Sequence, residues 1–358
     1  MIKKRHFGLD LFRAIAFFLV LITHSLFIVE KFNPKFRNFA FIGNLALEMF
    51  YALSGYLIGN IFFKNFIESD FSYKKVIEFL KNRWFKTLPT YYLIVCISLI
   101  VSYLQYGNFQ DFSIKFLFFT QNLHEANFFF FPTSYTLAIE EWFYLSFPLL
   151  FWLFVTIFKW DKLNTFIFLS VFFILFSTIF RFYKYYSFPN LHWDTGFRKS
   201  ILTRIDATAY GLLLSYFHKF KRDFIIKNTK KLFLIGVFGI ICCILIKMKV
   251  HSFILYTLYF NLMHISITMI LPTFFYLDVH QLRFKNIIHQ ISLISYCIYL
   301  VHLQLVYIPM GNLWQAKTLL EAIFQCFCMY FLAFMLGYLL YILVEKPMMK
   351  WRDKIKFV

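Results

Sequence analysis

The chain has 358 residues, 60% of them apolar and 23% aromatic, and it carries a formal net charge of +19. A single soluble core could not bury so much apolar side chain, so the composition excludes an ordinary soluble protein and indicates a polytopic membrane protein. All six cysteines lie inside apolar runs without the paired spacing of a zinc site, so we expect neither a disulfide framework nor a metal.

Ten apolar stretches predict a single all-α domain over residues 1–358, a helical bundle with about ten transmembrane helices. The stretches cover residues 7–29, 41–63, 88–106, 135–158, 164–186, 201–217, 232–247, 253–277, 287–308 and 318–344. The first stretch contains Arg13 and ends without a small-residue cleavage site, so we expect it to remain as a span and not to be removed as a signal peptide.

The positive charges divide unequally between the two sides of this arrangement. With the N-terminus in the cytoplasm, 24 Lys and Arg residues fall on the cytoplasmic side, 8 fall on the opposite side and five lie within the spans. The positive-inside rule therefore places both termini in the cytoplasm. Because the membrane orientation accounts for the charge, we expect no nucleic-acid partner.

The first span carries Asp10, Arg13 and His24, although an arginine in a membrane costs about 2.5–3.5 kcal/mol on insertion scales. Arg13 and His24 are three helical turns plus roughly 20° apart, with a rise of about 16 Å, so they share one face. A lone histidine could equally be a bonded core residue, but an arginine on the same face favours a functional site. We expect both side chains to project into one shared, water-reaching cavity, with Asp10 one turn from Arg13 and able to pair with it.

The second and third spans add further polar residues. Glu48 lies in a buried-looking stretch ahead of Ser54 and Gly55, and the Ser-Gly pair is interpreted as a close-packing site and not as a nucleophile. Arg83 and Lys86 stand one turn apart just before Pro89, where they are either positive-inside anchors or phosphate ligands.

Adjacent carboxylates, Glu140 and Glu141, occupy the fourth span. Neighbouring residues of a helix point about 100° apart, so we expect only one of them to face a given site. Glu140 is the residue predicted to point inward, because an aromatic run begins directly after Glu141.

Two later stretches carry polar pairs. Arg204 and Asp206 begin the sixth predicted span, where an ion pair and a ligand role are both open. Tyr299 and His302 are three residues apart in the ninth span, and the favoured interpretation of His302 is a hydrogen bond to the helix bundle.

Together these stretches resemble the acyltransferase 3 family, bacterial inner-membrane enzymes that transfer acyl groups, usually acetyl, to cell-surface carbohydrates. The most specific element is an arginine followed after ten residues by a histidine, here Arg13 and His24 within "LDLFRAIAFFLVLITHS". Supporting matches follow in the family's order: "FYALSGYLIG", "RWFKTLPTYY", "LAIEEWFYL", "RIDATAYGLLL", "SYCIYLVH" and "EKP". The resemblance covers nearly the whole chain.

The chain departs from the family's pattern at three points. Lys86 stands where the family usually has a second arginine, so a point charge replaces a bidentate fork. Glu48 stands where an aspartate is common, which lengthens the side chain by one methylene. Many relatives carry an extracytoplasmic C-terminal domain, whereas here we expect no such appended domain.

The resemblance implies a multi-pass O-acyltransferase of the inner membrane. It implies transfer of an acetyl or other short acyl group from cytoplasmic acyl-CoA, such as acetyl-CoA, to a hydroxyl of a cell-envelope or exported carbohydrate, for example lipopolysaccharide or another polysaccharide. His24, Arg13 and Glu140 are then the expected catalytic residues, and Arg13, Arg83 and Lys86 the expected coenzyme A ligands. Supporting roles fall to Asp10, Glu48, Arg204, Asp206, Tyr299 and His302.

The spacing leaves open whether the acyl group passes directly to the acceptor or rests on His24 as a covalent intermediate. The alternative function is a secondary transporter in which Arg13, His24, Glu48 and Glu140 form a proton or substrate relay. Transporters commonly show internal repeats, and the sequence shows no such halves, so the acyltransferase is favoured.

Overall fold

The computed structural model describes residues 6–109, 112–126, 130–248, 252–277 and 284–355, and within these ranges the backbone forms helices and turns without a strand. The all-α prediction is confirmed. The longer helices are α1 (Phe7–Val29), α2 (Phe41–Phe62), α3 (Tyr73–Tyr106), α4 (Ser134–Thr156), α5 (Lys162–Ser187), α6 (Ala209–Phe220), α7 (Arg222–Met248), α9 (Tyr259–Ile270), α11 (Lys285–Val301) and α13 (Leu319–Leu340). Shorter helical segments connect or extend them: η1 (Pro34–Ala40), η2 (Phe63–Ile67), η3 (Ile114–Phe118), η4 (Trp193–Arg198), α8 (Phe253–Thr257), α10 (Pro272–Phe275), η5 (His302–Tyr307), α12 (Ile308–Leu313), η6 (Tyr341–Glu345) and α14 (Lys346–Lys354).

Eight helical stretches of the described chain are long and apolar enough to cross a bilayer, which makes the protein a multi-pass membrane protein. They are Phe7–Val29, Pro34–Ile67, Tyr73–Leu104, Ser134–Thr156, Lys162–Ser187, Arg222–Met248, Lys285–Leu313 and Leu319–Lys354. Side chains of the outer helices support this assignment, because Ile179 of α5, Phe238 of α7 and Phe327 of α13 are each about two-thirds exposed. Such apolar surface is stable against lipid and not against water.

The two remaining predicted spans differ from the sequence-based expectation. Residues 201–208 form turns, so the sixth predicted span contains only the 12-residue α6. The predicted span over 253–277 is divided into α8, α9 and α10, and Pro272 begins the last of these. Irregular backbone at membrane depth is tolerated only where protein surrounds it, and residues 201–208 are almost entirely buried. The count of ten spans and the cytoplasmic termini therefore stay predictions.

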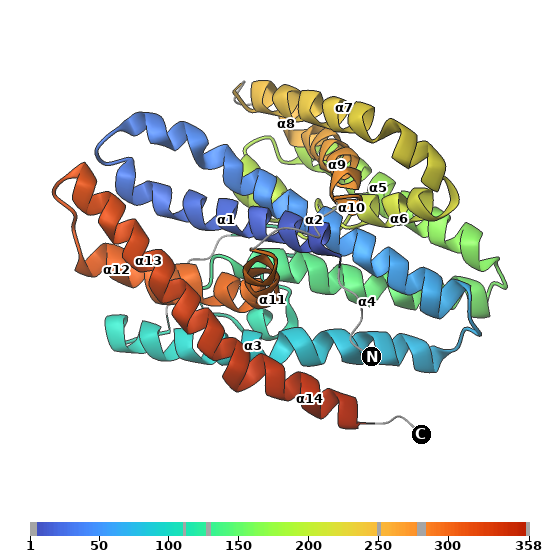
Figure 1. Ribbon diagram of the computed structural model, residues 1–358, viewed down its shortest axis with the longest axis horizontal. Helices are drawn as coiled ribbons and strands as arrows, with labels where there is room; N and C mark the ends of the chain where they lie inside the picture. The colour runs from blue at the N-terminus through green and yellow to red at the C-terminus, as the bar shows by residue number, and fades with distance from the viewer. Residues whose placement is uncertain (1–5, 110–111, 127–129, 249–251, 278–283, 356–358) are drawn as a thin grey trace.

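Helix α1 packs against α2, α11 and α13, while α2 packs against α6 and α9. In Figure 1, α1, α2 and α4 run through the middle of the molecule, with α7 along the upper edge and α3 along the lower edge. Burial agrees with this view, since 61% of the apolar window in residues 285–313 is buried but only 17% of that in α7. The central helices are the ones that carry the predicted site.

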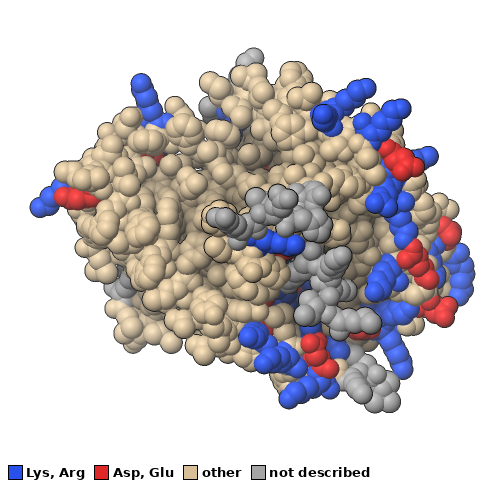
Figure 2. Space-filling view, viewed as in Figure 1, with Lys and Arg blue, Asp and Glu red and all other residues tan. Residues whose placement is uncertain are grey.

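Charged side chains gather at the end of the molecule where α2 ends, α3 begins and α6 meets α7, as Figures 1 and 2 show together. The exposed cations of these segments are Lys64, Lys74, Lys219, Lys221, Arg222, Lys227, Lys230 and Lys231. All of them belong to the side predicted to be cytoplasmic. Of the cations used for that prediction, six lie outside the described residues: Lys3, Lys4, Arg5, Lys249, Arg283 and Lys356.

Helices α2 and α6 approach closely because both present glycine at their contact. A Cβ added to Gly55 would overlap the backbone carbonyl of Thr208, and one added to Gly211 would overlap the carbonyl of Ala52. The interpretation of Ser54-Gly55 as a close-packing site is confirmed, since small residues allow two membrane helices to bring their backbones together.

Replacing Gly55 by alanine is expected to lower the free energy of unfolding by about 1–3 kcal/mol, because the new methyl group meets rigid backbone. Thermal unfolding of the purified protein in detergent measures the loss. Gly311→Ala is the matched control, since its Cβ would meet only the ring of Phe27. Equal stability of the two variants would contradict the close-packing interpretation.

Candidate functional site: two adjoining cavities

A cavity lies between α1, α2, α3, α4 and α11, with about 940 Å³ of space not filled by atoms, part of it open to solvent. Its lining includes Arg13 from α1, Arg83 and Lys86 from α3, and Glu140 and Glu141 from α4. We call it the Arg13 cavity. The three cations that the sequence grouped as anion ligands therefore line one cavity, although Arg13 precedes Arg83 by 70 residues in the chain.

Helix α3 presents Arg83 and Lys86 from within a continuous helix and not from a loop at its mouth. They precede Pro89, which has no N–H to donate and so frees a carbonyl in the preceding turn. The guanidinium of Arg83 lies 4.2 Å from the centre of the Tyr144 ring, a cation–π contact that fixes its direction. Tyr144 in turn hydrogen-bonds to Ser54 of α2 at 2.6 Å.

Both carboxylates of α4 reach the Arg13 cavity, so the prediction that only one of them faces a given site is wrong. Glu140 stands one helical turn before Tyr144 on α4, and Glu141 accepts a hydrogen bond from Thr87 Oγ1 at 3.0 Å. Thr87 of α3, the hydrogen-bond partner of Glu141, lines the same cavity. The described lining thus holds three cations against two carboxylates, which favours an anionic ligand.

Asp10 is buried at the foot of α1 and holds α11 in place. Its Oδ1 accepts a hydrogen bond from Ser292 Oγ at 2.7 Å, and its Oδ2 lies 3.0 Å from Nδ1 of His289. Ser292 also lines the Arg13 cavity. Asp10 therefore supports one wall of that cavity, and its pairing with Arg13 stays a prediction.

A second cavity, with about 640 Å³ of space not filled by atoms, part of it open to solvent, is lined by His24. Its lining includes Tyr135 of α4 and the consecutive cations Arg198 and Lys199, and we call it the His24 cavity. Leu47 and Tyr299 line both cavities. The expected single cavity shared by Arg13 and His24 is thus replaced by two adjoining cavities with a common wall.

Tyr299 forms part of that wall because its hydroxyl is fixed to α4. Its Oη lies 2.7 Å from Thr136 Oγ1 and donates to the carbonyl of Thr133 at 3.1 Å. Tyr299 of α11 therefore lines both cavities while its hydroxyl is tied to α4.

The ring of His24 is paired with the buried ring of His302, and the geometry sets the tautomer of both. His302 Nδ1 lies 2.7 Å from the carbonyl oxygen of Tyr299 and must donate, because a carbonyl can only accept. The neutral ring then accepts at Nε2, which lies 2.8 Å from Nδ1 of His24. His24 therefore carries its proton on Nδ1 and leaves Nε2 unprotonated, the form required of a base.

His302 reaches this position at the first residue of η5, a π-helical segment that follows α11. Such single-turn π-segments often occur at functional sites because they redirect side chains within a helix. The hydrogen bond that the sequence favoured for His302 is present. Its partner is the very histidine that the sequence singled out in the first span.

The cations of the His24 cavity are held by Asp194 and Tyr135. Lys199 Nζ lies 2.5 Å from Asp194 Oδ2, and Arg198 pairs with the same carboxylate through Nε and donates from Nη1 to Tyr135 Oη at 2.5 Å. Burial favours the neutral acid, but Arg198 and Lys199 outweigh burial and hold the pKa of Asp194 below its usual value. Burial and then the neighbouring Arg198 lower the pKa of Lys199.

Arg204 and Asp206 have separate partners and line neither described cavity. Arg204 Nη2 donates to the two oxygens of Glu48 at 2.5 and 2.7 Å, and its guanidinium lies 4.1 Å from the ring centre of Phe260. His264 Nδ1 lies 3.1 Å from Glu48. Glu48 and Arg204 thus form a buried structural ion pair.

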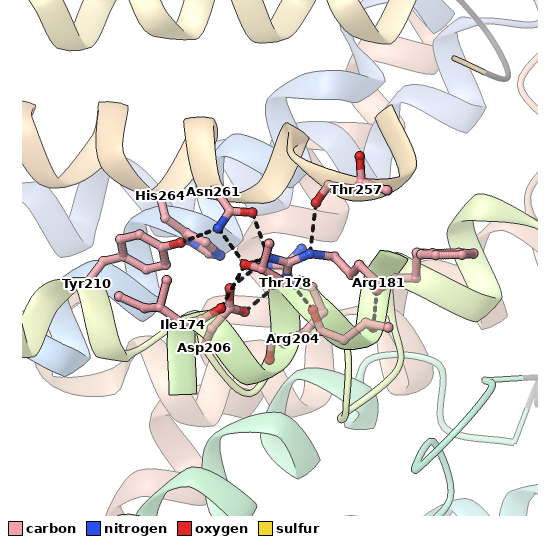
Figure 3. A network of polar contacts seen from close by, with 12 residues as sticks. Ile174, Thr178, Arg181, Arg204, Asp206, Tyr210, Thr257, Asn261 and His264 are labelled. Atoms are coloured by element: carbon pink, nitrogen blue, oxygen red, sulfur yellow. Dashed lines mark hydrogen bonds and ion pairs between the residues drawn. The ribbon is translucent and has the colours of Figure 1, made fainter. Parts of the chain in front are cut away.

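Asp206 pairs instead with Arg181 of α5 at 3.1 Å. Figure 3 shows the Arg181 guanidinium surrounded by Thr178, Asp206, Thr257 and Asn261. Its donors are satisfied by side chains and by the backbone carbonyls of residues 203 and 257. Arg204 and Asp206 thus both form ion pairs, with partners on α2 and α5, and their ligand role stays a prediction.

Sequence reasoning missed Arg198, Lys199 and Tyr135 as parts of the site. The two cations had been counted only as charges on one side of the membrane, and no periodicity distinguishes them from other loop cations. Arg181 was missed as a partner because it lies inside an apolar helix. Only the packing of distant segments brings these residues to their positions.

Comparison with known proteins identifies a family. The model of a family described as an acyltransferase domain matches residues 6–344, which is nearly the whole chain. No curated protein and no solved structure matches the chain.

Substituting Glu48 by glutamine is expected to lower the free energy of unfolding by about 3–5 kcal/mol, because Arg204 would keep its charge in a buried place without a counterion. Glu68→Gln is the control, since Glu68 pairs with Lys219 at the surface and its loss costs less than about 1 kcal/mol. Equilibrium unfolding in detergent measures both. Similar losses in the two variants would exclude the structural role assigned to Glu48.

Proposed function

Since the chain belongs to the acyltransferase family whose model spans residues 6–344, we propose that it transfers an acetyl or other short acyl group from acyl-CoA to a hydroxyl of a cell-envelope or exported carbohydrate. The observation that carries the proposal is the pair of cavities: one presents three cations, the other presents an oriented histidine, and Tyr299 is part of the wall between them. Together they offer separate places for the two substrates of a group transfer.

The Arg13 cavity is the proposed donor site. Arg13 and Arg83 carry planar guanidinium groups that bind phosphate oxygens in pairs, and Lys86 adds a point charge. The phosphates of coenzyme A supply the matching negative charge. The rise of about 16 Å between Arg13 and His24 is a distance that a pantetheine arm spans, and the thioester would reach His24 past Tyr299.

Glu140 lines the Arg13 cavity, together with the three cations, and does not line the His24 cavity. We therefore assign Glu140 a role in the donor site. There it stands one helical turn before Tyr144, whose ring contacts Arg83. In this proposal Glu140 is a positioning residue that orients the neighbouring cations by its charge.

His24 is the proposed general base. Its unprotonated Nε2 takes the proton of the acceptor hydroxyl while the oxygen attacks the thioester carbonyl. The carbon–sulfur bond then breaks, and the leaving thiolate takes the proton from His24 to give free coenzyme A and the acyl ester. His302 accepts from Nδ1–H throughout and keeps the ring in this tautomer.

The proposed setting is the inner membrane, with the Arg13 cavity supplied from the cytoplasm and the His24 cavity supplied from the opposite side. The exposed cations around the start of α3 and α7 support this orientation through the positive-inside rule. In this arrangement the acyl group crosses the membrane by moving from one cavity to the next.

His24→Ala is expected to reduce transfer by about 10²- to 10⁴-fold, because general-base assistance is lost. The measurement is the transfer of labelled acetyl from acetyl-CoA to the carbohydrate of membranes prepared without the native protein. His6→Ala is the control, since His6 is exposed before α1. Wild-type transfer by the His24 variant, or solute uptake by the native protein without acylation, would refute the proposal.

His302→Leu is expected to lower kcat at least about 10-fold with little change in the KM for acetyl-CoA, because His24 loses the acceptor that fixes its tautomer. His302→Gln is expected to recover part of the loss, since an amide oxygen can accept the same hydrogen bond. If His302 had a purely structural role, His302→Gln would recover no activity beyond what its thermal stability relative to His302→Leu explains.

A further inference from the structure

Two cations of the His24 cavity have no part in the proposed transfer step. Arg198 ends η4 and Lys199 follows it, and both line the cavity that contains His24. Their side chains are 15% and 25% exposed, so they are more buried than typical surface cations. Partly buried charges beside a candidate base indicate a functional site.

The cations are held in place by the surrounding chain. The backbone carbonyl of Lys199 accepts from Asn122 Nδ2 at 2.6 Å, and its N–H donates to the carbonyl of Asp194 at 3.1 Å. Arg198 is fixed through Tyr135, with which it also makes a cation–π contact at 5.2 Å. The two positive groups therefore form a rigid pair at one wall of the cavity.

One carboxylate serves both cations. Asp194 pairs with each of them, and among the described lining residues of the His24 cavity there is no Asp or Glu. One positive charge is left over when the pair and Asp194 are counted together. The contacts within the described chain use Nε and Nη1 of Arg198, so Nη2 and the remaining protons of Lys199 Nζ can serve a ligand.

Resting on the proposed function, we propose that the His24 cavity selects an acceptor that carries an anionic group, a phosphate or a carboxylate, close to the hydroxyl that receives the acyl group. Arg198 and Lys199 bind this anion and so place the hydroxyl at Nε2 of His24. Charge-assisted hydrogen bonds of this kind contribute about 1.5–3 kcal/mol, enough for roughly 10- to 100-fold discrimination against a neutral sugar.

The test is a binding measurement on the full-length protein in nanodiscs of phosphatidylcholine, without any acyl donor. The probes are glucose 1-phosphate, glucuronate and glucose. We expect at least one anionic sugar to bind about 10-fold or more tightly than glucose, and Lys199→Gln and Arg198→Gln to remove that preference. Lys115→Gln is the matched control, because Lys115 is an exposed cation that lines neither cavity.

Equal binding of the three sugars, or an unchanged preference in Lys199→Gln, would overturn the inference. Displacement of the bound anionic sugar by coenzyme A, with weaker coenzyme A binding in Lys199→Gln, would assign the cations to the donor and overturn it as well. Loss of sugar binding when phosphatidylglycerol is added would assign them to lipid headgroups, with the same consequence. Retention of sugar binding under both additions supports the acceptor assignment.

The binding test is separate from the test of the proposed function. If acetyl transfer by the native protein proceeds while anionic sugars show no preference, only the inference fails. If no transfer occurs while the preference and its dependence on Lys199 are present, the proposed chemistry fails and the anion site stands. Should Arg198→Gln lose its fold, Lys199→Gln alone decides the outcome, since Lys199 makes fewer contacts.

Discussion

The buried ion pairs of the segment between α5 and α6 are the constraint on which the candidate site depends. Arg204 reaches across to Glu48 of α2, and Asp206 reaches back to Arg181 of α5. Residues 199–208 are not helical, and irregular backbone at this depth needs partners that water would otherwise supply. The two ion pairs tie the backbone of this segment to α2 and α5. Arg198 and Lys199, just before it, line the His24 cavity.

The same principle explains how the opening helix can carry two costly polar residues. Arg13 faces a cavity that also holds carboxylates, and His24 is bonded to another imidazole, so neither is placed against lipid. Helix α1 is surrounded by α2, α11 and α13, which supply these neighbours. The two cavities thus lie at different heights along one helix, and α1 connects them.

Tyr299 links the two cavities to the imidazole pair. Tyr299 belongs to α11, and its backbone carbonyl accepts the hydrogen bond of His302, while its hydroxyl is fixed to α4. Tyr299 therefore lines both cavities and also accepts the hydrogen bond that orients His302.

The sequence by itself determined the properties that depend on residues near one another in the chain. Hydropathy set the all-α membrane fold, and helical periodicity placed Arg13 and His24 on one face and Arg83 one turn from Lys86. Transfer free energies and a period of 3.6 residues are local quantities, so they can be read without knowing which helices are neighbours.

Only the tertiary structure decided the partners. His24 and His302 are 278 residues apart. Arg204 pairs with Glu48 and not with Asp206, two residues along the chain. In the sequence, Arg198 could not be distinguished from any other loop cation. Packing also divided the expected single cavity in two and admitted both carboxylates of α4 to one of them. A hydrogen bond or an ion pair forms between surfaces that helix packing brings together, and that arrangement depends on the whole bundle and not on the spacing within any one helix.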